Sequence, residues 1–93
     1  MSLVRAQIAE ALILANEFKV QENIENFSEF SFVSSGMSVM CKELQAMEDE
    51  EIASYSSAFD VLIPKMRAIL EDGDYDEIYS LKSDIADILE LFL

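Results

Sequence analysis

Residues 30–41 read FSFVSSGMSVMC, twelve positions without a charged side chain in a 93-residue chain whose formal net charge is −13. From Phe27 onward, apolar or small residues recur in alternating steps of three and four, the spacing of one face of an α-helix. That face consists of Phe27, Phe30, Ser34, Met37, Cys41 and Leu44. The other faces carry Phe32, Val33, Val39 and Met40. A helix that is apolar nearly all round is a buried helix.

A strand is the alternative for residues 30–33, because Phe and Val favour strands. No second segment pairs with it convincingly, so we favour a helix that continues to about residue 46. Ser34, Ser35 and Gly36 would let another helix approach closely. The chain has only two glycines and one proline, which predicts few turns and long elements. We therefore expect an all-α protein.

The second half of the chain predicts two further helices. The third has one apolar face, made of Ile52, Tyr55, Phe59, Leu62, Met66 and Ile69. Asp49 or a neighbouring acidic residue is expected to cap its start. Pro64 lies inside this pattern and deprives the Asp60 carbonyl of its usual donor, so we predict a bend there.

Residues 71–77, EDGDYDE, predict a tight turn between these two helices. Gly73 can adopt the left-handed conformation that ends a helix. Asp74 and Glu77 have the spacing of a capping box at the start of the next one. The apolar face of that fourth helix is Ile78, Leu81, Ile85, Ile88 and Phe92. So short a turn predicts an antiparallel hairpin.

The first helix has an apolar face made of Val4, Ile8, Ala11, Ala15 and Phe18. Beyond residue 20 the apolar positions move to the opposite side, which predicts a break around Val20–Asn23. We therefore predict one domain, residues 1–93, folded as an antiparallel up-down bundle with helices at 3–20, 22–46, 50–72 and 74–92. Three helices with a long first one are the alternative. The start Met1-Ser2-Leu3 also fits an expression remnant, which would make the chain a fragment of a longer protein.

The charge balance limits the partners. Six Lys and Arg against nineteen Asp and Glu, with the cations scattered, disfavour nucleic acid and anionic membranes. Acidity keeps an apolar bundle soluble, or else it attracts a basic partner or mimics nucleic acid. One cysteine, Cys41, fits a buried core residue and a reducing cytoplasm. There is no signal peptide pattern and no apolar run long enough to span a membrane.

No residue set indicates an enzyme. The chain has no histidine, which removes the common catalytic triads and histidine metal sites, and it has no glycine-rich phosphate loop. Asp72, Asp74 and Asp76 alternate as at the start of a calcium loop, but the glycine and the final Glu are misplaced. Carboxylate pairs such as Asp84 and Asp87 are expected on solvated faces. We predict no catalytic residues, cofactor or metal.

The predicted function is a non-catalytic protein-interaction module, an adaptor or chaperone-like protein. A self-associating structural domain of a larger protein is the alternative, and an enzyme is a distant third. Aromatic and Met residues gather in the second helix, where flexible Met side chains suit an adaptable binding surface. The candidate partner or homodimer surface is Phe30, Phe32, Val33, Met37, Val39 and Met40. Core packing is the alternative role for these residues.

Residues 68–90, AILEDGDYDEIYSLKSDIADILE, resemble a helical hairpin of uncharacterised small helical proteins and domains from Firmicutes, some encoded near motility genes. The upstream helices are similar in pattern. The resemblance implies a helical architecture and a bacterial origin. It implies no activity.

Overall fold

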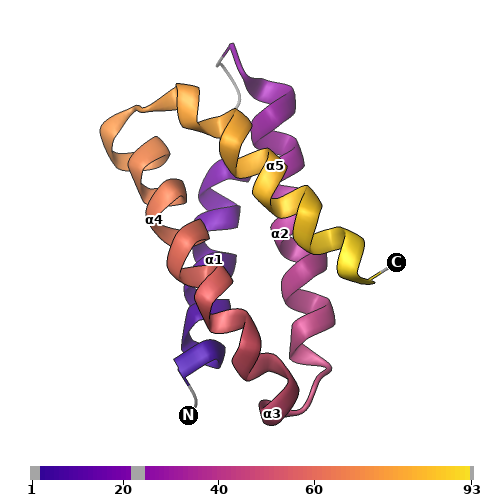
Figure 1. The fold of residues 1–93 in the computed structure, drawn as a ribbon. Coiled ribbons are helices and arrows are strands. Elements are labelled where there is room, and N and C mark those ends of the chain that lie inside the picture. The colour runs from indigo at the N-terminus through magenta and orange to yellow at the C-terminus, as the bar shows by residue number, and fades with distance from the viewer. Residues whose placement is uncertain (1–2, 22–24, 93) are drawn as a thin grey trace.

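A computed structural model describes residues 3–21 and 25–92 (Figure 1). The long helices are α1 (Leu3–Lys19), α2 (Phe27–Gln45), α4 (Ser56–Asp72) and α5 (Ile78–Leu89). The short elements are α3 (Asp49–Ile52) and the 3-10 turns η1 (Ala53–Tyr55), η2 (Tyr75–Glu77) and η3 (Glu90–Phe92). Strands are absent from the described ranges. The predicted all-α bundle of four helices is confirmed.

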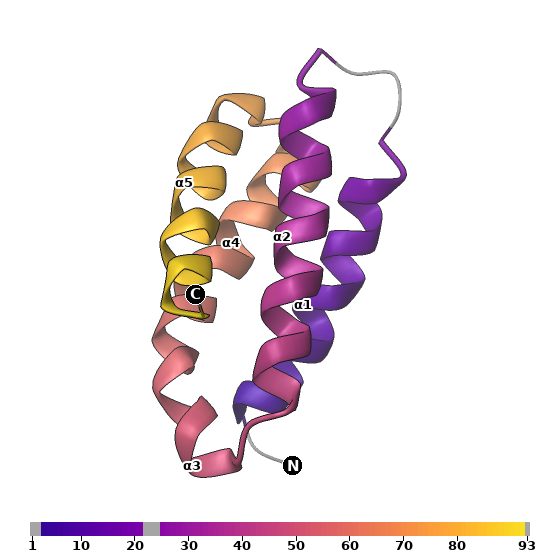
Figure 2. The same ribbon diagram turned by 90° about the vertical axis from the view of Figure 1, so that its right-hand side faces the viewer.

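The long helices alternate in direction along the chain and form two hairpins, α1–α2 and α4–α5 (Figure 2). The main contacts of α1 are with α2 and α4, and those of α5 are also with α2 and α4. The segment α3–η1 turns at the base of the bundle and brings α4 beside α1, although α2 precedes α4 in the chain. One hairpin is therefore stacked on the other.

The break after the first helix is where the reversal of the apolar face predicts it. α1 ends at Lys19 and Val20 lies in a turn, so the alternative of one long first helix is wrong. The predicted start of the second helix at residue 22 lies outside the described residues, and α2 begins at Phe27. Phe27 is predicted to lie in the core, but it is 47% exposed. It is the first residue of α2, at the end of the helix rather than in its middle.

The turn between α4 and α5 depends on Gly73. Its φ of 69° is the left-handed conformation, and the Asp74 N–H donates to the Ala68 carbonyl across the end of α4. The predicted capping box does not form, since the Asp74 side chain makes no capping hydrogen bond. Instead the Glu77 N–H donates to the Asp74 main-chain carbonyl at 3.1 Å, and η2 leads into α5.

The predicted third helix is divided. The 3-10 turn η1 separates α3 from α4, and Asp49 lies inside α3 rather than capping it. Asp49 instead accepts a hydrogen bond from Arg5 Nε at 2.7 Å, and a second Arg5 nitrogen donates to the Met47 carbonyl. These contacts hold the base of the bundle to α1. The helix α4 runs unbroken through the exposed Pro64, and the bend at this residue stays a prediction.

The core lies between the two hairpins. Its largest fully buried side chains include Phe18, Phe30, Phe59, Met37, Met40, Leu44, Leu62 and Met66. The rings of Phe18 and Phe30 lie 4.9 Å apart, which joins α1 to α2. Gln7 is the buried polar residue at the α1–α4 contact. Its amide donates to Asp60 Oδ1 at 2.9 Å and accepts from Ser56 Oγ at 2.9 Å, so its burial is compensated.

Candidate functional site

The predicted partner surface on α2 is mostly part of the core. Phe30, Val33, Met37 and Met40 are each at most 1% exposed within the single chain. They are therefore unavailable to a partner while the protein is folded, and this part of the prediction is corrected. Of the six residues only Phe32, half-buried, and Val39, 52% exposed, reach solvent.

The physical reason for this correction is that α2 is covered from two sides. α1 packs along one side, and α5 packs along another. Gly36 permits the second contact, because a Cβ atom there would lie 2.8 Å from Ile85 Cγ2. Phe32 lies beside the same contact under the Lys82 ammonium, 5.2 Å from the ring centre. The close approach predicted from the small residues is thus present. The two neighbouring helices cover Val33 and Met40, whereas Val39 stays exposed.

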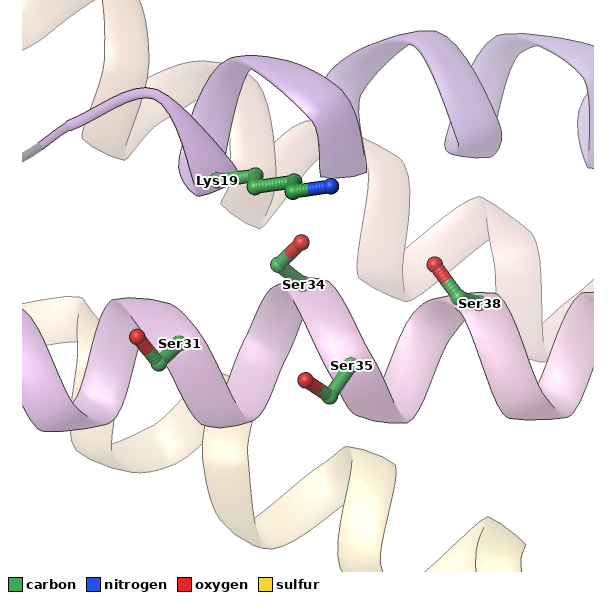
Figure 3. Close-up of a pocket in the computed structure, with 5 residues that line it drawn as sticks. All are labelled: Lys19, Ser31, Ser34, Ser35 and Ser38. Atoms are coloured by element: carbon green, nitrogen blue, oxygen red, sulfur yellow. The ribbon is translucent and has the colours of Figure 1, made fainter.

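A serine-lined hollow of about 480 Å³ lies between the end of α1 and the middle of α2 (Figure 3). Its described lining is Lys19, Ser31, Ser34, Ser35 and Ser38. Ser34 is the buried member, and Figure 3 shows its hydroxyl directed toward Lys19. A serine nucleophile needs an adjacent base. The described lining contains neither a carboxylate nor a histidine, and its amine, Lys19, is exposed to solvent, whereas a lysine that acts as a general base is a buried one. The hollow can hold water or a small polar molecule, but its residues do not assemble a catalytic group.

A second opening, of about 220 Å³, lies between α4 and α5. We call it the α4–α5 groove; its lining is Ala58, Val61 and Leu62 from α4 and Asp84, Asp87 and Ile88 from α5. In Figure 1 the two helices diverge from the turn that joins them, α5 toward α2 and α4 toward the base of the bundle. Leu62 is buried, whereas Val61 is 50% exposed and Ile88 is half-buried. The groove therefore presents apolar surface to solvent.

One edge of the α4–α5 groove is acidic. Both charged residues of its lining, Asp84 and Asp87, are carboxylates on α5. Lys65 of α4 spans the end nearer the turn, where its ammonium donates to Asp84 Oδ2 at 2.5 Å and to Ser80 Oγ at 2.7 Å. Asp87, one turn further along α5, is exposed. The groove thus combines an apolar floor with a rim where Asp84 is paired with Lys65 and Asp87 remains exposed.

The sequence contains signals for this groove outside the apolar faces from which the helices are predicted. Val61 lies off the apolar face of its helix, which leaves a large side chain without a place in the core. The sequence predicts Asp84 and Asp87 on a solvated face, and Ile88 on the apolar face of the same helix. The packing of α4 against α5 brings Val61 beside Asp84, Asp87 and Ile88. This packing is a tertiary contact that the local pattern of one helix does not show.

The solvent face of α1 carries small and apolar residues beside the carboxylates of Glu10 and Glu17. Ala6, Ala9 and Ile13 lie on it at helical spacing, Val20 follows in the turn after the helix, and all four are exposed. Ile13 is 64% and Val20 60% exposed, and Leu3 at the start of the helix is 69% exposed. This face is therefore a second surface with exposed apolar residues. It lies on α1, whereas the sequence predicts such a surface on α2.

Cys41 is fully buried, and burial raises the pKa of its thiol to about 12. A thiol with so high a pKa stays protonated at neutral pH and is a poor nucleophile. No three metal-ligand side chains converge anywhere in the described residues. Among the described helices, none combines the length and hydropathy that crossing a membrane requires.

Neither a protein-family model, nor a curated protein, nor a solved structure matches this chain. The resemblance of residues 68–90 to small helical proteins of Firmicutes therefore stays a prediction.

Proposed function

We propose that this chain is a non-catalytic protein-binding module, an adaptor or chaperone-like protein of a bacterial cytoplasm. The observation that carries the proposal is the α4–α5 groove, where Val61 and Ile88 present apolar surface between two helices. Most other large apolar side chains fill the core. Apolar surface that is left open on a small soluble domain commonly marks a contact with another protein.

The chemistry of the remaining side chains supports a binding role over a catalytic one. The chain has no histidine, and the Cys41 thiol is buried and protonated. The serine-lined hollow between α1 and α2 has neither a carboxylate nor a histidine in its described lining, and its Lys19 is exposed to solvent rather than buried as a general-base lysine is. General acid–base and nucleophilic catalysis both require a group poised to take a proton near neutral pH.

Affinity capture from the source organism tests the proposal. The bait proteins are the unmodified chain, Val61→Gln and Ile13→Gln. Ile13 is an apolar residue on a different face, 64% exposed against 50% for Val61. We expect a protein that is retained by the unmodified chain and by Ile13→Gln but lost with Val61→Gln. Retention of the same proteins by all three baits would contradict a binding role for the groove.

A self-associating structural domain is the second candidate. The observation that favours it is the pair of exposed apolar side chains Ile13 and Val20 on one side of α1 and the turn that follows it, because apolar surface left open on a small soluble domain commonly marks an interface. Light scattering at high protein concentration tests this candidate. Dimers that Ile13→Gln dissociates and Val61→Gln leaves intact would support it, and a monomer at every concentration would exclude it.

A further inference from the structure

We infer that the α4–α5 groove binds a basic amphipathic helix of a partner protein. In this arrangement the apolar face of the partner helix rests on Val61 and Ile88, and a Lys or Arg side chain of that helix reaches Asp87. The inference rests on the proposed function and names the class of partner for the same groove.

The size of the groove favours side chains of a helix over a whole small molecule. Pockets for metabolites and drugs commonly enclose about 300–1,000 Å³, whereas this groove has about 220 Å³. An amphipathic helix needs only enough depth for a few anchoring side chains, which repeat every three or four residues along one face. A groove between two helices offers that shape.

The apolar surface continues past the end of α5 into η3. Leu91 follows Ile88 by three residues, which places it on the same side of the helix, and it is 68% exposed. Next to it the rings of Phe92 and Tyr55 stack, with centres 6.0 Å apart. Val61, Ile88 and Leu91 therefore provide successive contacts for more than one turn of a bound helix.

The charges decide between possible occupants. Asp84 is already paired with Lys65, while Asp87 is exposed and pairs with no cation in the described part of the chain. A basic side chain beside Asp87 gains a partner. A second copy of this acidic chain, an anionic lipid surface or a nucleic acid would bring negative charge against this rim, which opposes association. A basic helix is the occupant that satisfies both the floor and the rim.

Designed peptides test the inference with the full 93-residue chain. One 18-residue peptide has Leu at i, i+3, i+4 and i+7 spacing and Lys elsewhere; a second has Glu in place of Lys; a third has the Leu/Lys composition in scrambled order. Fluorescence anisotropy measures their affinities. We expect the amphipathic Leu/Lys peptide to bind at least about ten-fold more tightly than the scrambled one, because only the former presents a continuous apolar face.

Two pairs of variants locate the bound peptide. Val61→Gln should weaken binding of the amphipathic Leu/Lys peptide about five-fold or more, whereas Ile13→Gln on α1 should not. Asp87→Lys should weaken it about five-fold, whereas Glu43→Lys, the same charge change at an exposed site on α2, should have a much smaller effect. Raising the salt concentration should also weaken binding.

The inference is overturned if the scrambled peptide binds equally well, or if each variant and its control have the same effect, since both results describe general attraction to an acidic protein. It is also overturned if the Leu/Glu peptide binds more tightly. The proposed function and this inference can be told apart by experiment. If affinity capture still loses a protein with Val61→Gln while the Leu/Lys peptide does not bind, the groove binds proteins but not basic helices.

Discussion

Gly36 shows how one residue determines the distance between two helices. A Cβ atom at this position would lie 2.8 Å from Ile85 Cγ2 and 3.5 Å from Leu89 Cδ1. Ile85 is fully buried and β-branched, so its Cγ2 methyl cannot rotate away freely. The absence of a side chain at Gly36 is therefore part of the α2–α5 contact.

We expect Gly36→Ala to lower the free energy of unfolding by about 1 kcal/mol. Overpacking a core contact costs about 1–3 kcal/mol, which exceeds the gain of about 1 kcal/mol in helix propensity from Gly to Ala. Urea denaturation measures the difference. Ser35→Ala, at the exposed neighbouring position, is the control and should be as stable as the unmodified chain or slightly more so. A Gly36→Ala variant with undiminished stability would show that α5 does not pack closely on α2.

Cys41 should resist alkylation in the folded protein. Burial raises the pKa of its thiol from 9.0 to about 12, so almost no thiolate is present at pH 8. Iodoacetamide labelling followed by mass spectrometry should show no modification without urea and complete modification in urea. Ser35→Cys adds an exposed thiol as a positive control. Rapid native labelling at Cys41 would contradict its burial.

The same pKa shift has a consequence for stability. The folded state favours the neutral thiol, and the unfolded chain ionises at its ordinary pKa near 9.0. Below that pH the group has no effect on the free energy of unfolding. Above it the unfolded state is increasingly favoured, up to a pH of about 12.

At the scale of the helices, Pro64 is the residue whose effect is still a prediction. α4 continues through it from Ser56 to Asp72, and the proline faces solvent. Pro64→Ala restores an N–H donor for the Asp60 carbonyl and removes the steric clash. We expect the variant to be more stable, by at most about 3 kcal/mol.

Residual dipolar couplings test the bend itself. In the unmodified chain the axis of residues 56–62 should be inclined to that of residues 66–72, and in Pro64→Ala the two should align more closely. The prediction is wrong if the angle between the two axes is the same in both proteins. It is also wrong if Pro64→Ala is less stable than the unmodified chain.

A substitution at Met40 tests whether this side of α2 lies in the core or at the surface. On a homodimer surface, as the sequence predicts for Met40, a Glu would give a soluble monomer, but Met40 is 1% exposed in the single chain. A carboxylate placed there loses its hydration without a partner, at a cost of at least about 5 kcal/mol, comparable to the whole stability of a small domain. We expect circular dichroism to show loss of helix for Met40→Glu. Val39→Glu, its exposed neighbour, should remain folded. A folded Met40→Glu protein would restore α2 as an interface.

The helices were predictable because their signals are local. The three-and-four spacing identified α2, α4 and α5, Gly73 marked the turn, and the change of apolar face placed the end of α1 near Val20. The role of α2 was not predictable in the same way. A pattern shows that Val33 and Met40 are apolar, but whether a second helix of the same chain covers them depends on which helices become neighbours. That is a property of the assembled fold.

At the scale of the whole molecule, the stacking of two hairpins determines which apolar residues remain at the surface. α2 lies against both α1 and α5, so its candidate residues are used in the core. α4 and α5 diverge, so Val61 and Ile88 remain accessible between them beside Asp87. A sequence-based account could identify the exposed valine and the carboxylate pair, but not that they border one groove.

The most direct test of the α4–α5 groove as the binding surface is a titration followed by NMR. The ¹H–¹⁵N spectrum of the 93-residue chain is recorded with increasing amounts of the amphipathic Leu/Lys peptide. The account predicts that the largest shift changes occur in residues 58–62 and 84–91, on the two helices that line the groove, with little change along α1. Changes that are largest on α1, or that spread evenly over the acidic surface, would contradict it.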